Sequence, residues 1–377
     1  MLTRVMMIAG EASGDLHGAG VVRELHARVP SVEIYGIGGD RMRQEGMELV
    51  EHISAVSFMG FAEVVKHLPT IRSVEKQMES LLAIRKPDVL VLIDYPGFNL
   101  RFARKAKKVG VKILYYISPQ VWAWNKKRVK KMKGVVDRMK VVFPFEVDLY
   151  RREGIDVEFV GHPLVETIGC SSTREEFCTA RGLSPDRRLL ALLPGSRKQE
   201  VEKILPTMIS AALRLQQSHD VQTAIGIAPA LGQNFLKQFV PGGSSIKFIE
   251  HGTYDLMKHA DAAMVTSGTA TLETGWFATP MVVVYKTSSL TYLIGRLLID
   301  VPYIGLVNIV AGKKVVPEFI QHEMNANNLA NAVGRILDDP SYAAAMRSEL
   351  SEIRQNLGVP GASARVADGV LQLASAA

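Results

Sequence analysis

The chain contains little cysteine and no long apolar run, and both absences exclude whole classes of protein. Its 2 cysteines, Cys170 and Cys178, cannot build a disulfide framework or complete a zinc site alone, so a reducing compartment is expected. No apolar run approaches the roughly 20 residues of a membrane-spanning helix. The apolar stretch between Arg4 and Glu11 is also too short for a secretory signal peptide. We therefore expect a cytoplasmic protein.

The common cofactor motifs are missing as well. Gly10, Gly14 and Gly18 stand four residues apart, which differs from the G-x-G-x-x-G spacing that binds dinucleotides, and the glycines of 36–39 are irregularly spaced. The chain has no G-x-x-x-x-G-K-[ST] phosphate loop and no Asp-x-Asp metal motif. We therefore expect no cofactor, whether NAD, ATP or a metal ion.

Composition and charge describe a globular protein with one strongly basic segment. Of the 377 residues, 47% are hydrophobic and 22% are charged, and this length exceeds what one core usually encloses, so two domains are expected. The formal net charge is +7. Much of this excess stands close together, at Lys126, Lys127, Arg128, Lys130, Lys131 and Lys133. Such a cluster attracts an anionic partner and leaves phosphate-bearing lipid, nucleic acid and a nucleotide sugar open.

Short apolar, β-branched runs alternate with helical patterns along most of the chain, which is the rhythm of parallel sheets. In the first half the expected strands are 5–9, 32–37, 89–93, 112–117, 139–143 and 157–160. After a polar stretch the rhythm restarts, with expected strands at 189–193, 223–227, 246–249, 262–265 and 281–285. We therefore predict an α/β protein with two Rossmann-like domains, 1–166 and 167–337, and helices in 338–377 that could pack on either.

In an open parallel sheet ligands bind at the carboxyl ends of the strands, so the loops there are the candidate site. The segment Ser267–Glu273 follows an expected strand and opens a helix, where free backbone N–H groups and the positive dipole end receive a diphosphate. The alternative is helix capping, worth roughly 0.3–1 kcal/mol, but Thr269 and Glu273 stand four residues apart and a capping box needs three. The candidate contacts are Ser267, Gly268, Thr269, Ala270 and Glu273.

A second loop of this kind is Pro194–Arg197, after the first expected strand of the second domain. A guanidinium offers fixed, paired donors to phosphate oxygens, whereas a cation at a helix start is poorly placed without an anion. We therefore predict that Ser196 and Arg197 contact the diphosphate. The alternative is a surface arginine at the start of a helix.

Three carboxylates follow expected strands of the first domain, at Asp94, Glu11 and Asp15. Transfer of a group to a hydroxyl needs a base for the hydroxyl proton, and one positioned carboxylate suffices. For Asp94 the alternative is an Asx turn ahead of a proline. Glu11 and Asp15 either compete for the catalytic role or hold the acceptor and the turn in place, together with Ser13 and Gly14.

Several segments between residues 9 and about 321 share an order and spacing with one known family. They are Gly10–Asp15, Asp94–Asn99, Ser118–Trp124, Gly161–Leu164, Pro194–Arg197, Ser267–Glu273 and Asn308–Ala311, with Pro317–Gln321 soon after. Together they closely resemble the lipid A disaccharide synthase family of bacterial glycosyltransferases. For His162, within one of these segments, a structural role is at least as well supported as a ligand contact.

The resemblance implies a GT-B fold, in which the two domains face a cleft. It also implies inverting transfer of 2,3-diacylglucosamine from its UDP derivative to the 6-hydroxyl of 2,3-diacylglucosamine 1-phosphate, giving the lipid A disaccharide 1-phosphate and UDP. It places the catalytic base at Asp94, a ribose contact at Glu273 and a donor contact at Asn308. The alternatives are another GT-B enzyme of UDP-N-acetylglucosamine, such as the peptidoglycan-precursor transferase or a 2-epimerase, and an RNA-binding or membrane-scaffold protein using 122–133.

An amphipathic helix is expected near residues 58–82, because apolar residues recur there at three- and four-residue steps. They are Phe58, Phe61, Val64, Val65, Leu68, Ile71, Val74, Met78, Leu81 and Leu82. This stripe either faces the core or dips into the inner membrane, helped by the basic segment, Trp122 and Trp124. In the second case the protein is peripherally associated with the inner membrane, where its lipid substrates lie. We expect no nucleic-acid partner, and a homodimer stays open.

Overall fold

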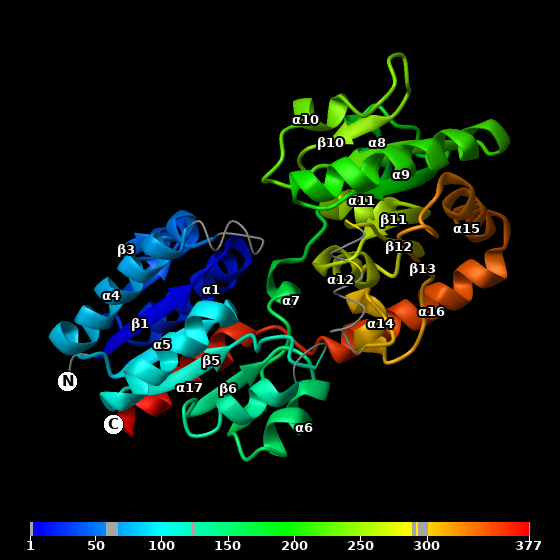
Figure 1. The fold of residues 1–377 in the computed structure, drawn as a ribbon. Coiled ribbons are helices and arrows are strands. Elements are labelled where there is room, and N and C mark those ends of the chain that lie inside the picture. Colours follow the sequence, from blue (N-terminus) through cyan, green and yellow to red (C-terminus); the bar gives the residue numbers. More distant parts are fainter. Residues whose placement is uncertain (1–2, 58–66, 123–125, 289–291, 293–300, 377) are drawn as a thin grey trace. The chain divides into compact units, whose positions relative to one another are not determined.

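The structure is a computed structural model that describes residues 3–57, 67–122, 126–288, 292 and 301–376. It divides into two compact units: the first is Met1–Glu166 with Leu357–Ala377, and the second is Thr167–Asn356. The C-terminal residues are therefore divided between the two units. Helix α16 (Pro340–Asn356) belongs to the second unit, and α17 (Ala362–Ser375), red in Figure 1, belongs to the first. Among the described residues no helix has the length and apolar character to cross a bilayer.

The first unit is built on a seven-stranded sheet in the order β3-β2-β1-β4-β5-β6-β7, with every pairing parallel. The strands are β1 (Arg4–Ala9), β2 (Glu33–Gly38), β3 (Glu48–His52), β4 (Val89–Ile93), β5 (Lys112–Tyr116), β6 (Arg138–Val141) and β7 (Val157–Phe159). The central strands read as continuous apolar runs because helices cover both faces of a parallel sheet.

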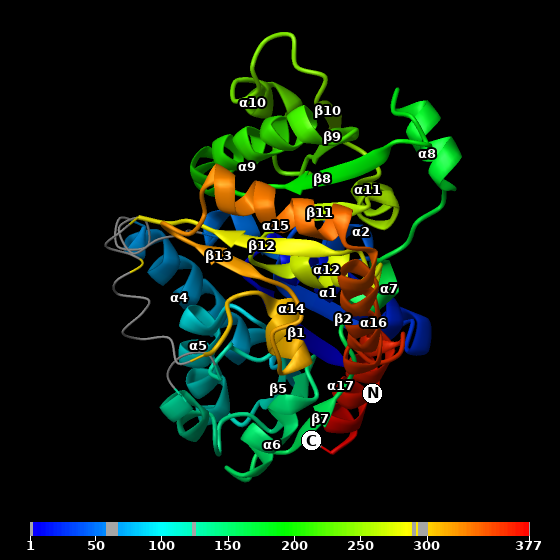
Figure 2. The ribbon, with the colours of Figure 1, turned by 90° about the vertical axis from the view of Figure 1, so that its right-hand side faces the viewer.

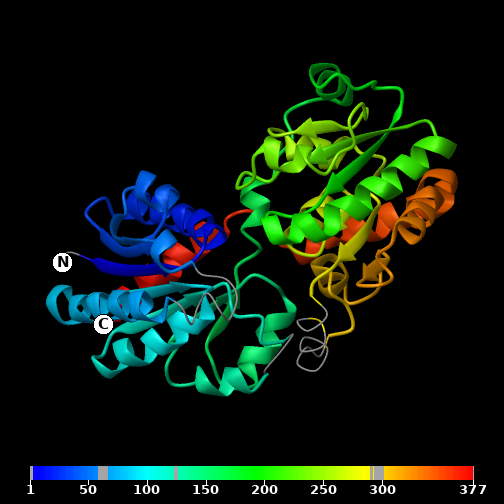
Figure 3. The ribbon, with the colours of Figure 1, turned by 45° about the horizontal axis from the view of Figure 1, so that its top comes forward.

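Two layers of helices cover this sheet. Alternate strand residues point to opposite layers: Met6 and Ile8 share a core with α4 (Leu68–Arg85) and α5 (Pro96–Lys108). Ile93 approaches a glycine of α1 (Ala12–Arg28), and Leu114 approaches one of α17. Figure 3 shows the light-blue α4 and the red α17 on either side of the strands. The shorter elements are α2 (Asp40–Gln44), η1 (Ile53–Ala55), η2 (Lys126–Lys131), α6 (Phe145–Arg151) and α7 (Leu164–Thr167).

The second unit repeats the plan with a six-stranded parallel sheet in the order β10-β9-β8-β11-β12-β13. Figure 2 shows β8, β11, β12 and β13 side by side. The strands are β8 (Arg188–Leu193), β9 (Val221–Gly226), β10 (Lys247–Ile249), β11 (Ala262–Thr266), β12 (Met281–Tyr285) and β13 (Glu318–Ile320). The helices are α8 (Arg174–Ala180), α9 (Lys198–Ser218), α10 (Gln233–Lys237), α11 (Thr253–His259), α12 (Thr269–Trp276), α14 (Leu306–Ala311), α15 (Ala326–Asp338) and α16.

All eleven expected strands form, with ends that differ by at most two residues from those predicted, and two further strands among the described residues were not predicted. These are β3 and β13, which lie at the outer edges of the two sheets. An edge strand pairs on one side only, so it does not need the long apolar run that marks a central strand. The strand β3, Glu48–His52, has polar residues at both ends, and β13, Glu318–Ile320, has only three residues. Neither segment therefore shows the apolar pattern that predicts a strand.

Four described residues of the apolar stripe of 58–82 belong to the core, whereas Leu68 and Leu81 are partly buried. Ile71, Val74, Met78 and Leu82 are at most 5% exposed and pack into the core of the first unit. The membrane alternative is therefore wrong for these four residues, because their side chains are already buried against the sheet. Phe58, Phe61, Val64 and Val65 lie outside the described residues, as does Trp124.

Candidate active site

The turn after β4 holds Asp94 in a strained backbone conformation. Asp94 and Tyr95 have φ values of +44° and +46°, which side-chain-bearing residues rarely adopt and which cost of order 1–3 kcal/mol each. Buried partners fix the turn: the Asp94 N–H donates to the Tyr116 carbonyl at 3.0 Å, and the Asp94 carbonyl accepts from the Tyr115 hydroxyl at 2.6 Å. Strain at a strand's carboxyl end, held by buried groups, is typical of a functional site.

Asn99, in the first turn of α5, is the third support of this turn. It is fully buried, and its amide nitrogen donates to the carbonyl of Asp94 at 2.7 Å and to that of Ile93 at 3.3 Å. An Asx turn at Asp94 would need a backbone N–H two residues later as its donor. Pro96 stands at that position and carries no N–H, so this donor is missing. The backbone of the turn is thus held by Asn99 and Tyr115, and the Asp94 carboxyl is left for another role.

Glu11, just before α1, lies next to the Asp94 carboxyl group. Burial is the main cause that raises the pKa of Asp94, and the negative charge of Glu11 adds to it, so the pKa reaches about 7. The Ser13 hydroxyl donates to Glu11 Oε1 at 3.0 Å. A carboxylate whose pKa lies near the working pH is suited to accept a proton from a hydroxyl. The prediction of Asp94 as a base thus gains a specific neighbour in Glu11.

Asp15 is engaged in hydrogen bonds to the backbone. Its side chain is 5% exposed and accepts from the backbone N–H groups of Gly39, Arg41 and Met42, at 2.7, 3.2 and 3.0 Å. These bonds satisfy the amino end of α2. The carboxylate is therefore engaged with the backbone, which is the turn-holding alternative named above for Asp15.

The glycines of the first loop serve close packing. A Cβ on Gly10 would lie within 2.1–2.5 Å of the Tyr95 ring, so only a glycine admits that ring against β1. Gly14 is buried, and a Cβ there would meet Ala9 at 3.3 Å. Gly14 therefore lets α1 approach the sheet closely. Ser13 remains exposed beside Glu11.

The second unit has a cavity of about 730 Å³ at the carboxyl edge of its sheet, called here the carboxyl-edge cavity. Its walls come from the loops after β8, β9, β10 and β11. Each of the predicted contacts in this unit except Asn308 lines it: Ser196, Arg197, Ser267, Gly268, Thr269, Ala270 and Glu273. A cavity built from four strand-end loops is the expected place for a ligand in this fold.

The start of α12 presents free backbone donors to this cavity. Gly268 precedes the helix with φ +149°, and Thr271 bonds back to the Gly268 carbonyl through both its N–H and its hydroxyl, at 3.1 and 2.8 Å. Within the described residues no acceptor is recorded for the N–H groups of Thr269 and Ala270. These two donors and the helix dipole suit an anion. The Ser267 hydroxyl donates to the Ile304 carbonyl at 2.7 Å.

Arg197 stands at the amino end of α9 on the cavity wall. Its guanidinium pairs with Glu200 at 2.8 Å, and the side chain is 53% exposed. An exposed pair of this kind contributes little to folding stability, so the guanidinium can exchange Glu200 for an anion at small cost.

Glu273, in the second turn of α12, is the acid of the cavity. Burial raises its pKa, and a hydrogen bond from the Tyr254 hydroxyl to Oε1, at 3.3 Å, acts in the opposite direction. Tyr254 was not predicted from the sequence, because one tyrosine in a short helix carries no pattern.

Asn308 is held by hydrogen bonds within the second unit. It lies in α14, fully buried, and its amide nitrogen donates to the Val316 carbonyl and to Glu318 Oε1, both at 2.9 Å. Its amide oxygen accepts from the N–H groups of Val315 and Val316, at 2.8 and 3.0 Å. Four bonds fill the hydrogen-bonding capacity of the side chain, so it holds the segment after α14 in place.

Buried histidines and a cysteine cluster are explained by local structure. His162 Nδ1 accepts from the Leu164 N–H at 3.1 Å, and burial lowers the pKa of His162 to about 3, which fits the structural alternative. Cys170, Asp255 and His259 lie within 4.8 Å of one another and have the donor types of a metal site. However, Asp255 accepts from the Ser172 N–H and hydroxyl, and His259 Nε2 bonds the Ser172 carbonyl at 2.9 Å. These contacts hold the loop around Ser172.

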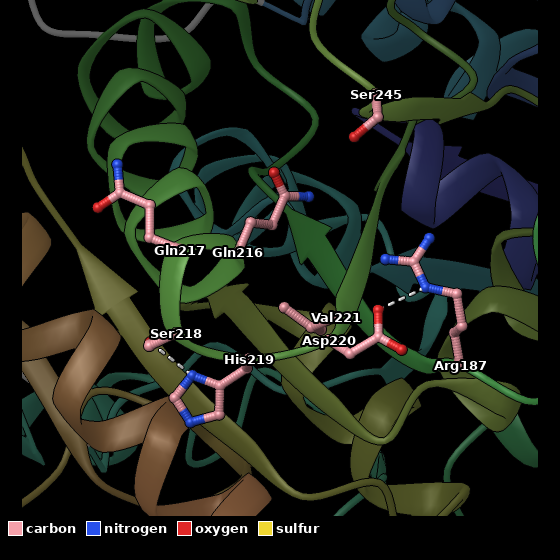
Figure 4. A pocket seen from close by; sticks show the side chains of 8 residues that line it. All are labelled: Arg187, Gln216, Gln217, Ser218, His219, Asp220, Val221 and Ser245. Carbon is pink, nitrogen blue, oxygen red and sulfur yellow. Dashed lines mark hydrogen bonds and ion pairs between the residues drawn. The ribbon is translucent and has the colours of Figure 1, made fainter.

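A second hollow, of about 460 Å³, opens at the opposite edge of the second sheet, near the start of β9 (Figure 4). Its polar side chains pair with one another: Arg187 Nε lies 2.7 Å from Asp220, and Ser218 lies 2.8 Å from His219 Nδ1. It is lined from strand amino ends, whereas ligands of this fold bind at carboxyl ends. The carboxyl-edge cavity is therefore the candidate ligand site of the second unit.

The chain matches the model of one known protein family over most of its length. The model of the family described as lipid-A-disaccharide synthetase matches residues 5–363. The chain belongs to this family. It is 44% identical over 372 residues to the lipid-A-disaccharide synthase of Geobacter sulfurreducens, covering 98% of this chain and 97% of that one. Identity to the same enzyme of Syntrophus aciditrophicus is 46%, with the same coverage. The predicted family is thus confirmed, and the enzyme is a glycosyltransferase.

Solved structures show the same fold at low identity. The UDP-GlcNAc 2-epimerase of Neisseria meningitidis, solved with UDP-GlcNAc bound, aligns with a TM-score of 0.68 and 12% identity over 98% of this chain and all 100% of that one. The calicheamicin glycosyltransferase CalG4 aligns with a TM-score of 0.65 and 15% identity over 99% and 98%. These likenesses confirm two Rossmann-like domains of GT-B type. They do not favour the epimerase alternative, because the family match identifies the synthases.

Proposed function

We propose that this enzyme transfers 2,3-diacylglucosamine from UDP-2,3-diacylglucosamine to the 6-hydroxyl of 2,3-diacylglucosamine 1-phosphate. The family match over residues 5–363 carries the proposal. The acceptor and the base are assigned to the first unit, at the turn after β4, and the UDP-sugar to the carboxyl-edge cavity of the second unit. The two ligand roles are thereby divided between two sheets of the same design.

In the first unit, Asp94 takes the proton of the acceptor hydroxyl. The hydroxyl oxygen then forms its bond to the anomeric carbon of the donor sugar while the bond from that carbon to the diphosphate oxygen breaks. UDP leaves with the bonding electron pair, and attack opposite the leaving group inverts the anomeric centre. The raised pKa of Asp94, about 7, supports this role, because a stronger base removes the proton more readily.

In the second unit, the diphosphate is assigned to the start of α12 and to Arg197. The free N–H groups of Thr269 and Ala270 and the guanidinium supply positive charge where the leaving group gains negative charge. The Glu273 carboxylate is assigned to the ribose hydroxyls. The cavity volume of about 730 Å³ is of the size that small-molecule ligands occupy in proteins.

The release of UDP by the purified enzyme tests this function. UDP is measured with 2,3-diacylated UDP-glucosamine as donor and 2,3-diacylglucosamine 1-phosphate as acceptor, and then with UDP-N-acetylglucosamine as donor. We expect release only with the diacylated donor and only when the acceptor is present. Equal release with UDP-N-acetylglucosamine would instead support the peptidoglycan-type or epimerase alternative.

We also propose peripheral association with anionic membranes through the segment around Phe145. This side chain is 37% exposed and stacks on Phe143, and the Trp122 ring packs edge-on against it at 5.4 Å. Lys130, Lys131 and Lys133 are also exposed. Exposed aromatic and basic side chains suit an anionic lipid interface. In flotation with vesicles containing phosphatidylglycerol, the wild type should float, and a Lys130, Lys131 and Lys133 to Gln triple variant should float less. Equal flotation would refute this surface.

A further inference from the structure

Tyr254 lines the carboxyl-edge cavity, and the proposed reaction gives this residue no role. It lies in α11, and its hydroxyl donates to Glu273 Oε1, in α12, at 3.3 Å. Both side chains line the cavity. The Tyr254 hydroxyl therefore contacts Glu273, the carboxylate assigned to the ribose.

The hydroxyl proton of Tyr254 is used in this one bond. The hydroxyl donates to Glu273 Oε1 at 3.3 Å. A phenol carries a single proton, so that proton points to Glu273. The ring rests against Phe277, with centroids 6.2 Å apart.

Glu273 depends on this contact. Burial raises the pKa of Glu273 and favours its neutral form, while the Tyr254 bond favours the charged form. Among the described residues Tyr254 is the donor recorded on this carboxylate, and none is recorded on Oε2. One oxygen is therefore held by the protein, and the other is left to accept from a ligand.

We propose that Tyr254 is a positioning residue for nucleotide recognition: by holding Oε1 of Glu273, it turns Oε2 toward the ribose hydroxyls and sets the preference for ribonucleotides over nucleotides that lack those hydroxyls. This rests on the proposed function, which places UDP in the carboxyl-edge cavity. The ligand class is a uridine diphosphate whose 2′- and 3′-hydroxyls donate to the carboxylate.

Calorimetry with UDP and with 2′,3′-dideoxy-UDP tests the proposal. The wild type should bind UDP more tightly than the dideoxy ligand. Tyr254→Phe keeps the ring and removes the proton, so UDP affinity should fall about five- to tenfold while affinity for the dideoxy ligand stays unchanged. Glu273→Gln should lower the same discrimination further. Tyr342→Phe, which alters a tyrosine of α16 stacked by Arg335 at 4.0 Å and not on the cavity wall, should change neither affinity.

Other outcomes overturn the proposal in distinguishable ways. If Tyr254→Phe weakens both ligands equally, the residue supports the cavity as a whole and sets no preference. If it changes neither affinity, the hydrogen bond has no function in binding. A wild type that binds UDP and the dideoxy ligand equally refutes the ribose role of Glu273 and with it this inference, whereas a wild type that binds no UDP refutes the donor site of the proposed function.

Discussion

The amide nitrogen of Asn99 lies 2.7 Å from the backbone carbonyl of Asp94, from a fully buried position in the first turn of α5. It also reaches the Ile93 carbonyl at 3.3 Å, so one side chain satisfies two carbonyls at the end of β4. Asp94 and Tyr95 both have positive φ. The two bonds therefore support a strained stretch of backbone at the assigned base.

Asn99→Asp should therefore destabilise the fold and slow the reaction. The substitution keeps the shape and removes the donor to the Ile93 and Asp94 carbonyls, of which the Asp94 carbonyl keeps the Tyr115 hydroxyl. Facing a buried carbonyl with an acceptor in place of its donor costs about 1–3 kcal/mol. The free energy of unfolding in urea and kcat should both fall. Asn331→Asp, at an exposed position of α15, is the matched control and should change neither. Unchanged stability in Asn99→Asp would mean that the turn holds itself.

Asp94→Asn should lower kcat by about 10²–10⁴-fold, the contribution typical of a general base. The amide keeps the shape of the carboxyl but cannot take the hydroxyl proton. UDP affinity should remain near that of the wild type, because UDP is assigned to the second unit. Near-normal turnover of this variant, together with a large loss in Glu11→Gln, would assign the base to Glu11.

The same variant should be more stable than the wild type above pH 7. The pKa of Asp94 is about 7 in the folded protein, above its ordinary value of 3.8. A raised carboxyl pKa contributes stability that is present at low pH and is lost as the pH rises through about 7, when the buried group must ionise. Asp94→Asn removes that loss, so its gain in Tm should be larger at pH 8 than at pH 5. A gain that is equal at both pH values would contradict the raised pKa.

Glu11→Gln should shift the pH dependence of kcat/KM. In the wild type kcat/KM should rise with pH and level off above about 7, as Asp94 of the free enzyme loses its proton. Removing the negative charge of Glu11 makes ionisation of Asp94 easier, so the midpoint should move to lower pH. Glu175→Gln, at an exposed site in the second unit, should leave the midpoint unchanged. A midpoint that stays fixed in Glu11→Gln would show that the two carboxyls do not interact.

The sequence was sufficient for the sheets and for the loops that carry charge, because buried parallel strands are continuous apolar runs and ligand loops follow them. The positions of Asp94 and Arg197 in strand-end loops could be predicted, since each residue follows such a run. The hydrogen-bond partners that decide the role of a side chain could not be predicted. Asp15 meets backbone N–H groups 24 or more residues away, and Asn308 meets Val315 and Val316 across a turn that no pattern marks. Asp15 was predicted as a catalytic carboxylate or a residue that holds the turn, and Asn308 as a donor contact, whereas the hydrogen bonds recorded for both are internal.

Arg197→Ala should weaken UDP binding while the fold persists. A charge-assisted contact is worth about 1.5–3 kcal/mol, which corresponds to a loss of roughly 10- to 150-fold in affinity. Stability should stay nearly constant, because the pair with Glu200 is exposed and such pairs contribute little. Arg188→Ala, whose side chain is 50% exposed and pairs loosely with Asp338 at 3.9 Å, removes an equal charge away from the cavity and should bind UDP normally. If Arg197→Ala keeps its UDP affinity with an unchanged circular dichroism spectrum, the diphosphate is held without this guanidinium, and the start of α12 alone must supply its donors.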